Sequence, residues 1–140
     1  MCHSQAQIEK SAHEISEVIA DYKTRHLWDC NYAEGYLVKE MSENISIHYI
    51  KTKKVAVVAS RDQYLVISLQ TIKAEDSPSG KKRMIVGARS KDIDEYPPKD
   101  GIVRASSFIT GWYLEEIRPN VCDVHFMIET DYKLSLFLQK

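Results

Sequence analysis

Hydrophobic side chains near the start of the chain recur with the period of an α-helix. They are spaced four, three, four and three residues apart, which places them on one stripe of a helix surface. Ser4, with Gln7 three residues later, fits a helix start as a capping pair. The pattern predicts one amphipathic helix, whose stripe needs a sheet or a second helix to cover it. The stripe consists of Ile8, Ala12, Ile15, Ile19 and Tyr22.

From about Tyr36 onward the hydrophobic period changes to two residues, which is typical of β-strands. Val124, Phe126 and Ile128, for example, would share one face of a strand. Short connections between successive strands favour an antiparallel meander. The sequence therefore predicts the α+β class, with one helix followed by about seven strands in a single domain of residues 1–140. The strand candidates lie at residues 45–49, 55–59, 65–69, 83–89, 102–109, 112–117 and 121–130.

The charge balance and the cysteine count narrow the range of partners and compartments. The 140 residues carry 19 basic and 20 acidic side chains, a net charge of −1. General nucleic-acid binding needs an excess of positive charge, so we expect no nucleic-acid partner. The longest apolar runs, such as residues 55–59, are far too short to cross a bilayer. Three widely spaced cysteines disfavour a disulfide framework, so we expect a reducing compartment, the cytoplasm.

The sequence motifs of enzymes and metal sites are missing. His13 and Glu14 begin a zinc-protease pattern, but Glu17 stands where the second histidine is required. No Cys-x-x-Cys pair, glycine-rich phosphate loop or Gly-x-Ser-x-Gly motif occurs. The neighbouring carboxylates Glu115 and Glu116 would point to opposite faces of a strand and could not flank one bond. We therefore expect a protein without catalytic residues, metal ion or cofactor.

Two clusters of basic residues flank predicted turns. Solvated hairpin ends are the simplest interpretation of both. The alternative is contact with anionic membrane headgroups, where each surface cation contributes about 1 kcal/mol. The second cluster is favoured for this role because it lies beside the turn-rich loop at residues 74–82. The first cluster is Lys51, Lys53 and Lys54, and the second is Lys81, Lys82 and Arg83.

Five short stretches carry a resemblance to a known family. They are His26-Leu27-Trp28-Asp29, Val58-Ala59-Ser60-Arg61-Asp62, Tyr96-Pro97-Pro98, Gly101-Ile102-Val103-Arg104 and Gly111-Trp112. Their order and spacing resemble the START domain, the lipid-transfer domain related to the steroidogenic acute regulatory protein, over about residues 11–133. The resemblance implies a helix-grip fold, in which a curved antiparallel sheet wraps around a helix and encloses a lipid-sized tunnel.

The same resemblance implies a domain that is incomplete at both ends. START domains begin with a further helix and three strands, and they end with an amphipathic helix across the tunnel mouth. The chain shows no counterpart of either part. We therefore expect a free sheet edge, which favours homo-oligomers, and lipid transfer that is weaker than that of a complete domain, or absent.

The resemblance also suggests which residues meet the ligand. In several START proteins an acidic residue and an arginine face the tunnel and hold the polar group of the ligand. Counting from Arg61, the acidic position falls on His48, or on Tyr49 with one residue of slippage, and the arginine position falls on Ile67. Neither charge is present, so the resemblance implies an apolar tunnel with one neutral hydrogen-bonding group, as a sterol requires.

Arg61, Arg104 and Trp112 complete the predicted ligand-binding set. Each also has a structural interpretation. Arg61 would form an ion pair with Asp62 at a strand corner, Arg104 would bond a neighbouring loop, and Trp112 would pack in the core, as we expect for Trp28.

The predicted function is the non-enzymatic binding and transfer of a lipid, a sterol or a phospholipid, by a cytoplasmic protein that meets membrane surfaces transiently. One alternative is a degenerate module of the same fold that lacks an accessible tunnel and binds a protein partner. A second alternative is a hydrolase on a related scaffold, for which the sequence shows no clustered nucleophile and base.

Overall fold

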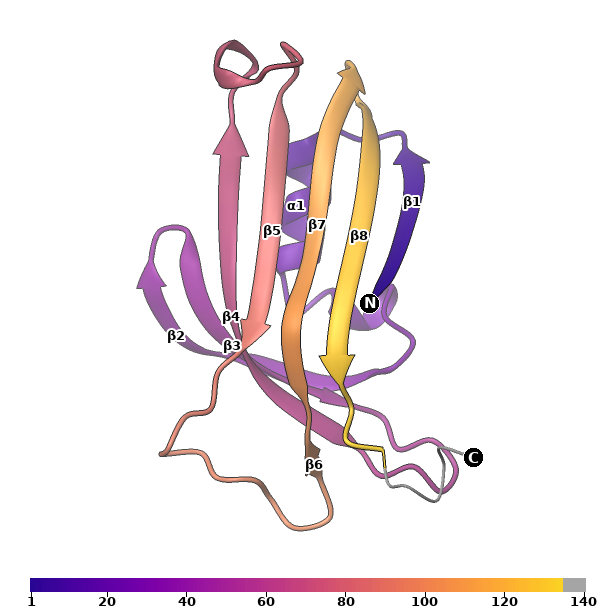
Figure 1. Ribbon diagram of the computed structural model, residues 1–140, viewed down its shortest axis with the longest axis vertical. Coiled ribbons are helices and arrows are strands. Elements are labelled where there is room, and N and C mark those ends of the chain that lie inside the picture. Colours follow the sequence, from indigo (N-terminus) through magenta and orange to yellow (C-terminus); the bar gives the residue numbers. More distant parts are fainter. Residues whose placement is uncertain (135–140) are drawn as a thin grey trace.

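One large sheet dominates the molecule (Figure 1). The structure is a computed structural model, and it describes residues 1–134. The strand order is β1-β8-β7-β5-β4-β3-β2, and the short β6 pairs with β4 in parallel, whereas every other pairing is antiparallel. The strands are β1 (Cys2–Ile8), β2 (Tyr32–Ser42), β3 (Ile45–Thr52), β4 (Arg61–Ile72), β5 (Arg83–Ser90), β6 (Val103–Arg104), β7 (Ser106–Arg118) and β8 (Val121–Asp131).

The predicted α+β class and the antiparallel meander are confirmed. The strands from β2 to β8, apart from β6, follow one another across the sheet in chain order. The predicted strand at residues 55–59 is wrong, because these residues form the tip of the β3–β4 hairpin. The backbones of Val55 and Val58 form an isolated antiparallel β-bridge there, and Ala56 between them has a φ of +50°. The backbone thus reverses inside an apolar run that the period alone assigns to a strand.

Among residues 1–134 there is one α-helix, α1 (Ala12–Ala20), which begins four residues later than Ile8, the first residue of the predicted stripe. Ser11 caps it, because the Ser11 hydroxyl accepts the backbone N–H of Glu14 and the Glu14 carboxylate accepts the backbone N–H of Ser11. Ser4 is therefore not a cap. Residues 2–8 instead form β1, which pairs with β8 from Cys2 opposite Ile128 to Ile8 opposite Cys122. Pairing along a whole strand overrides one residue's match to a helical period.

Helix α1 packs on one face of the sheet, which we call the inner face, over β5 and β7 (Figure 1). Ala12 and Ile15 join Met84, Leu114 and Cys122 in a buried cluster, so the predicted stripe does face the core. Two short 3₁₀ turns, η1 (Arg25–Leu27) and η2 (Ala74–Asp76), complete the helical elements of residues 1–134. Within that range, no helix is long and apolar enough to span a bilayer.

The opposite, outer face carries a row of tyrosines. Tyr36, Tyr49, Tyr64 and Tyr96 lie in sequence with ring centroids 4.8, 5.1 and 5.1 Å apart. Tyr49 is 0% exposed, and its hydroxyl is buried without a hydrogen-bond partner among the described residues. The row ties the loop that holds Tyr96 to three strands of the sheet.

A buried ion pair fixes the same loop, and it differs from the predicted one. Asp62 pairs with Arg104, not with Arg61: Nε of Arg104 donates to Oδ1 of Asp62 at 2.7 Å, and Nη2 donates to Oδ2 at 3.2 Å. Arg104 also donates to the carbonyl of Tyr96 at 3.3 Å, which matches its predicted structural role. Hydrogen bonding to Asp62 raises the pKa of Arg104, so the guanidinium stays charged. Bidentate pairing is the geometry that best offsets the cost of burying two charges.

Candidate functional site

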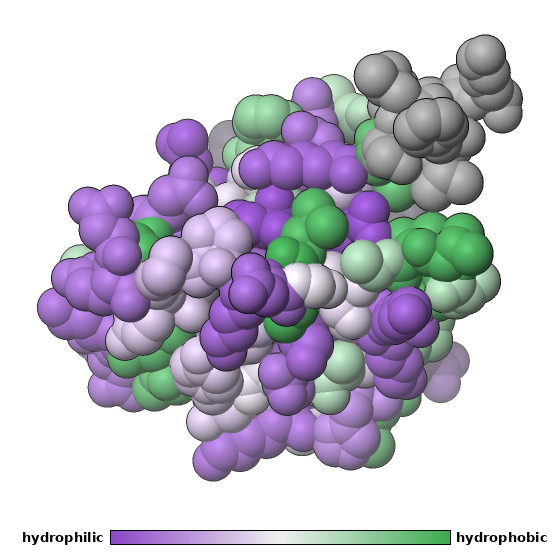
Figure 2. All heavy atoms as spheres, turned by 90° about the horizontal axis from the view of Figure 1, so that it is seen from below, coloured by the Kyte–Doolittle hydropathy of each residue, from purple (hydrophilic) through white to green (hydrophobic). Residues whose placement is uncertain are grey.

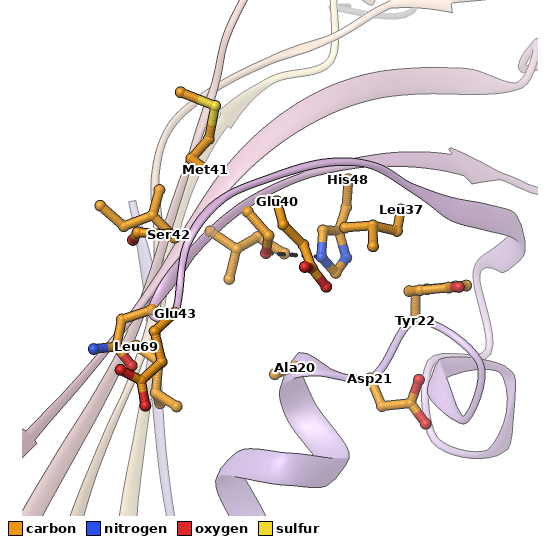
Figure 3. A pocket seen from close by; sticks show the side chains of 14 residues that line it. Ala20, Asp21, Tyr22, Leu37, Glu40, Met41, Ser42, Glu43, His48 and Leu69 are labelled. Carbon is orange, nitrogen blue, oxygen red and sulfur yellow. Dashed lines mark hydrogen bonds between the residues drawn. The ribbon is translucent and has the colours of Figure 1, made fainter.

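Two hollows open on the inner face of the sheet. The first, which we call the hairpin hollow, lies between the end of α1 and the β2–β3 hairpin and measures about 520 Å³ (Figure 3). The second, the tryptophan hollow, measures about 510 Å³ and is lined by Trp28, Trp112 and residues of β3, β4, β7 and β8. Residues 20–32, which leave the end of α1, contribute to both linings. Each hollow has the size of a small-molecule site.

His48 is the buried polar group of the hairpin hollow. Its side chain points into the space beside Leu37 and Glu40 (Figure 3), and the residue is 6% exposed. Nε2 lies 2.9 Å from the Ser46 hydroxyl, whereas Nδ1 is buried and has no partner among the described residues. Burial, followed by the charge of Arg25, lowers the pKa of His48 below its usual value. His48 is therefore neutral at pH 7, and one ring nitrogen is left for a ligand.

Ile67, at the predicted arginine position, lines the same hollow as His48. The two strands β3 and β4 that carry them are neighbours, with Ser46 opposite Ile67 and His48 opposite Leu65. Side chains at these positions share one face of the sheet. The structure thus brings together the two positions that the resemblance to the START domain suggested, and neither carries a formal charge in this chain.

Aromatic rings form a wall of the tryptophan hollow. The rings of Trp28 and Trp112 meet edge to face with centroids 6.1 Å apart, and Trp112 contacts Phe126 at 4.8 Å. Trp28 is 40% exposed, so the prediction that it is a core residue is wrong. It covers the hollow instead, because residues 20–32 cross the inner face without reaching the core cluster of α1. Such rings offer large apolar contact areas to a ligand.

Arg61 lines the tryptophan hollow and is buried. Its Nε donates to the carbonyl of Tyr132 at 3.1 Å, and its Nη1 donates to the carbonyl of Ala59. No carboxylate among residues 1–134 forms an ion pair with it, since Asp62 is held by Arg104. The guanidinium therefore holds the end of β4 to neighbouring chain segments and brings a positive charge to the edge of the hollow.

The predicted site residues fall into three groups. His48 and Ile67 line the hairpin hollow, and Arg61 and Trp112 line the tryptophan hollow. Tyr49 and Arg104 line neither hollow. Tyr49 follows His48 along β3 and therefore points to the outer face, where it stacks between Tyr36 and Tyr64. Arg104 is engaged by Asp62.

Several lining residues were not predicted from the sequence. Tyr22 was assigned to the helix stripe, but it follows the end of α1 and meets His48 edge to face with centroids 5.5 Å apart. The sequence did not indicate that Glu40 lines the hollow, because a register shift in β2 decides on which face of the sheet Glu40 lies. In the described part of the chain, no group of three or more histidine, cysteine or acidic residues is arranged to hold a metal ion.

A family model and several known proteins match most of the chain. The family model described as the START domain matches residues 3–137. The human protein named START domain-containing protein 10 is 27% identical over 125 residues, which are 89% of this chain and 40% of that protein. A rat acetyl-coenzyme A thioesterase is 22% identical over 121 residues, 86% of this chain and 21% of that protein. The chain thus spans well under half the length of these curated relatives.

Solved structures show the same fold. The crystal structure of human STARD10 superposes with a TM-score of 0.83 at 22% identity, over 96% of this chain and 52% of that one. Human StAR-related lipid transfer protein 5 superposes with a TM-score of 0.79 at 16% identity, over 92% of this chain and 60% of that one. The predicted helix-grip architecture is therefore confirmed.

Proposed function

Because the chain belongs to the START domain family, we propose that it binds one small lipid without chemical change and exchanges it at membrane surfaces in the cytoplasm. The observation that carries this proposal is the tryptophan hollow. Its aromatic and aliphatic lining includes Trp28, Trp112, Phe126 and Ile128. Each methylene group that a lipid buries there stabilises the complex by about 0.8 kcal/mol.

A lipid with one small polar group, such as a sterol, suits the hairpin hollow better than a phospholipid does. The two positions that carry opposite charges in several START proteins are His48 and Ile67 here. His48 is neutral because its pKa is lowered, and its Nδ1 has no partner among the described residues. A hydroxyl group could satisfy this nitrogen, whereas a phosphate would find no cation among the residues that line the hairpin hollow.

The tip of the β3–β4 hairpin is the membrane contact that we propose. Val55 and Val57 are 59% and 85% exposed, and Lys53 and Lys54 precede them. Lys53 and Val55 also line the tryptophan hollow, so the tip stands at its mouth. Figure 2, which looks onto this end of the molecule, shows hydrophobic side chains at the surface among hydrophilic ones. Aliphatic groups next to lysines suit the boundary between headgroups and acyl chains.

The basic cluster at residues 81–83 is less suited to this role than predicted. Arg83 Nε lies 2.9 Å from the Glu115 carboxylate, and Lys81 Nζ lies 3.9 Å from it. These charges are partly neutralised before any membrane is met. We therefore place the membrane contact at the hairpin tip.

We propose no catalytic role for the chain, although one relative is named a thioesterase. The rat thioesterase shares 22% identity with this chain, and the match covers 21% of its length. The buried thiol, Cys122, is a poor nucleophile because burial raises its pKa to about 11. A lipid-binding role needs none of these groups to react.

Lipid capture tests the proposal directly. Native mass spectrometry would measure the occupancy of the purified chain after incubation with cholesterol-containing vesicles. Ile128→Trp fills the tryptophan hollow, whereas Met127→Trp adds the same ring on the outer face of β8. We expect the wild type and Met127→Trp to carry one lipid, and Ile128→Trp to lose at least about tenfold in occupancy.

Equal capture by Ile128→Trp and the wild type would show that the hollow is not the lipid site. Absence of lipid from all three proteins, each folded as judged by circular dichroism, would favour the alternative of an interaction module without an accessible tunnel.

A further inference from the structure

The hairpin hollow is lined by negative charge only. Asp21, Glu40 and Glu43 contribute carboxylates to its lining, and no lysine or arginine of the described residues does. None of the three carboxylates forms an ion pair within residues 1–134. Lys23 Nζ lies 5.9 Å from the centroid of the Tyr22 ring, but Lys23 does not line the hollow. Arg25, whose charge lowers the pKa of His48, does not line the hollow and is paired with Asp29 at 2.9 Å. The lining itself therefore favours a positively charged group over a neutral or negative one.

A β-bulge in β2 delivers the central carboxylate. Leu37 lies opposite His48 on β3, but Lys39 lies opposite Ile47 and Glu40 lies opposite Ser46, so the register shifts by one residue between Leu37 and Lys39. A regular strand would place Lys39 opposite Ser46 and turn its ammonium group toward the hollow. The bulge turns Glu40 inward instead, beside His48 (Figure 3). Bulges commonly re-aim a side chain in this way next to functional sites.

His48 provides a second and independent indication of a ligand. The residue is more than nine-tenths buried, it points into the hollow, and its Nδ1 has no partner among the described residues. In the tautomer that donates from Nε2 to the Ser46 hydroxyl, Nδ1 carries a lone pair and needs an N–H or O–H donor. Nδ1 is buried, and Tyr22 packs edge to face against the ring with centroids 5.5 Å apart, so we expect Tyr22 to move when a ligand reaches this nitrogen.

We propose that the hairpin hollow binds the protonated primary amine of a single-chain lipid. The ammonium group donates hydrogen bonds to Nδ1 of His48 and to the carboxylate of Glu40, and the hydrocarbon chain packs on Ile67 and Leu69. This inference rests on the proposed lipid-binding function and specifies the polar group that the lipid carries. A sterol hydroxyl satisfies His48 alone, whereas an ammonium group also compensates the carboxylates.

Three probes with the same hydrocarbon chain isolate the effect of charge. Dodecylamine is cationic at pH 7, since alkylamines titrate near pH 10.4 as lysine does, while dodecanol is neutral and dodecanoate is anionic. Titration calorimetry at low ionic strength, below the micelle concentrations, would measure their affinities. We expect the wild type to prefer dodecylamine to dodecanol by about tenfold, and to bind dodecanoate most weakly.

Charge-removing variants assign the preference to Glu40. Glu40→Gln keeps the shape of an exposed side chain, so this variant should fold. We expect it to lose most of the preference for dodecylamine and to keep the affinity of the wild type for dodecanol. Glu129→Gln makes the same substitution on the exposed part of β8, outside both hollows. It should retain the tenfold preference of the wild type.

Equal affinities of the wild type for dodecylamine and dodecanol would overturn the amine site and leave the proposed lipid-binding function standing. A preference that persists in the Glu40→Gln, Glu43→Gln double variant would overturn it as well. If no probe binds while the vesicle experiment shows lipid capture, the amine site fails alone. If neither experiment shows a ligand, both proposals fail.

Discussion

At the scale of single residues, the buried hydroxyl of Tyr49 destabilises the folded state, whereas the ring of the same residue stabilises it by packing. The ring stacks on Tyr36 and packs against Tyr64, whereas the hydroxyl has no hydrogen-bond partner among the described residues. Tyr49→Phe keeps the ring contacts and removes the unpaired polar group. We expect the free energy of unfolding to rise by about 1 kcal/mol. Urea denaturation checks this, and a loss of stability would reveal a partner for the hydroxyl.

His48 should make the stability of the protein depend on pH. Burial lowers its pKa in the folded state, so below pH 6.5 the unfolded chain takes up a proton that the folded chain resists. The contribution of His48 is therefore present above pH 6.5 and is lost as the pH falls toward its folded-state pKa. The loss is at most about 1.4 kcal/mol per pH unit.

Urea denaturation at pH 7 and pH 5 measures this effect. His48→Leu should lose less stability between the two pH values than the wild type does. His26→Gln, a substitution at an exposed histidine of η1, should keep the wild-type difference. Equal pH dependence in His48→Leu and the wild type would show that His48 is not the cause of the loss of stability at low pH.

How far the sequence predicts the site differs from residue to residue. The alternation along β3 predicts that His48 and Tyr49 point to opposite faces, and the structure agrees. The side of β2 on which Glu40 lies was not predictable, because a single bulge reverses the alternation after Leu37 and leaves no mark in the hydrophobic pattern. Trp28 was misassigned because an aromatic residue that covers a ligand hollow resembles a core residue in composition.

At the scale of the elements, β1 and β2 are the outermost strands of the sheet that residues 1–134 form, and their outer edges differ. β2 carries three register shifts and the charged residues Glu34, Lys39 and Glu40. β1 pairs with β8 without a shift and holds no aspartate, glutamate, lysine, arginine or proline between Cys2 and Ile8. Bulges and charges are the features that prevent edge-to-edge pairing. We therefore propose that, in the 140-residue chain by itself, β1 pairs with β1 of a second copy, which refines the predicted homo-oligomer.

Sedimentation velocity at tens of micromolar tests this pairing. An antiparallel pair of β1 strands centred on Gln5 places Gln5 of one copy opposite Gln5 of the other, so Gln5→Lys would set two positive charges face to face and should give a monomer. Gln70→Lys, on an interior strand, is the control and should leave the dimer intact. A monomeric wild type at this concentration would exclude the pairing.

The start of α1 marks the limit of what periodicity predicts about an element. The stripe from Ala12 to Ile19 was correct, because side chains that face the core must follow the helical period. Ile8 matched the same period and belongs to β1. Its place is decided by a long-range partner, Cys122 of β8, which no local pattern contains.

At the scale of the whole molecule, the hairpin tip and the tryptophan hollow lie together, which links membrane contact to ligand exchange. Val57→Asp removes apolar area from the tip and adds a negative charge. We expect the affinity for vesicles that contain an anionic phospholipid to fall about tenfold, while the free energy of unfolding stays unchanged. Val18→Asp, at an exposed valine of α1, is the control in a cosedimentation assay. Equal losses in the two variants would contradict a specific role of the tip.

Residues 20–32 form a partition between two compartments on one face of the molecule. Tyr22 lines one compartment and Trp28 lines the other, and one short backbone segment, residues 23–27, joins them. We therefore expect a guest that displaces Tyr22 to change the position of Trp28, which would link the affinities of the two compartments thermodynamically. By reciprocity, the first occupant helps or hinders the second by the same factor in either order of loading.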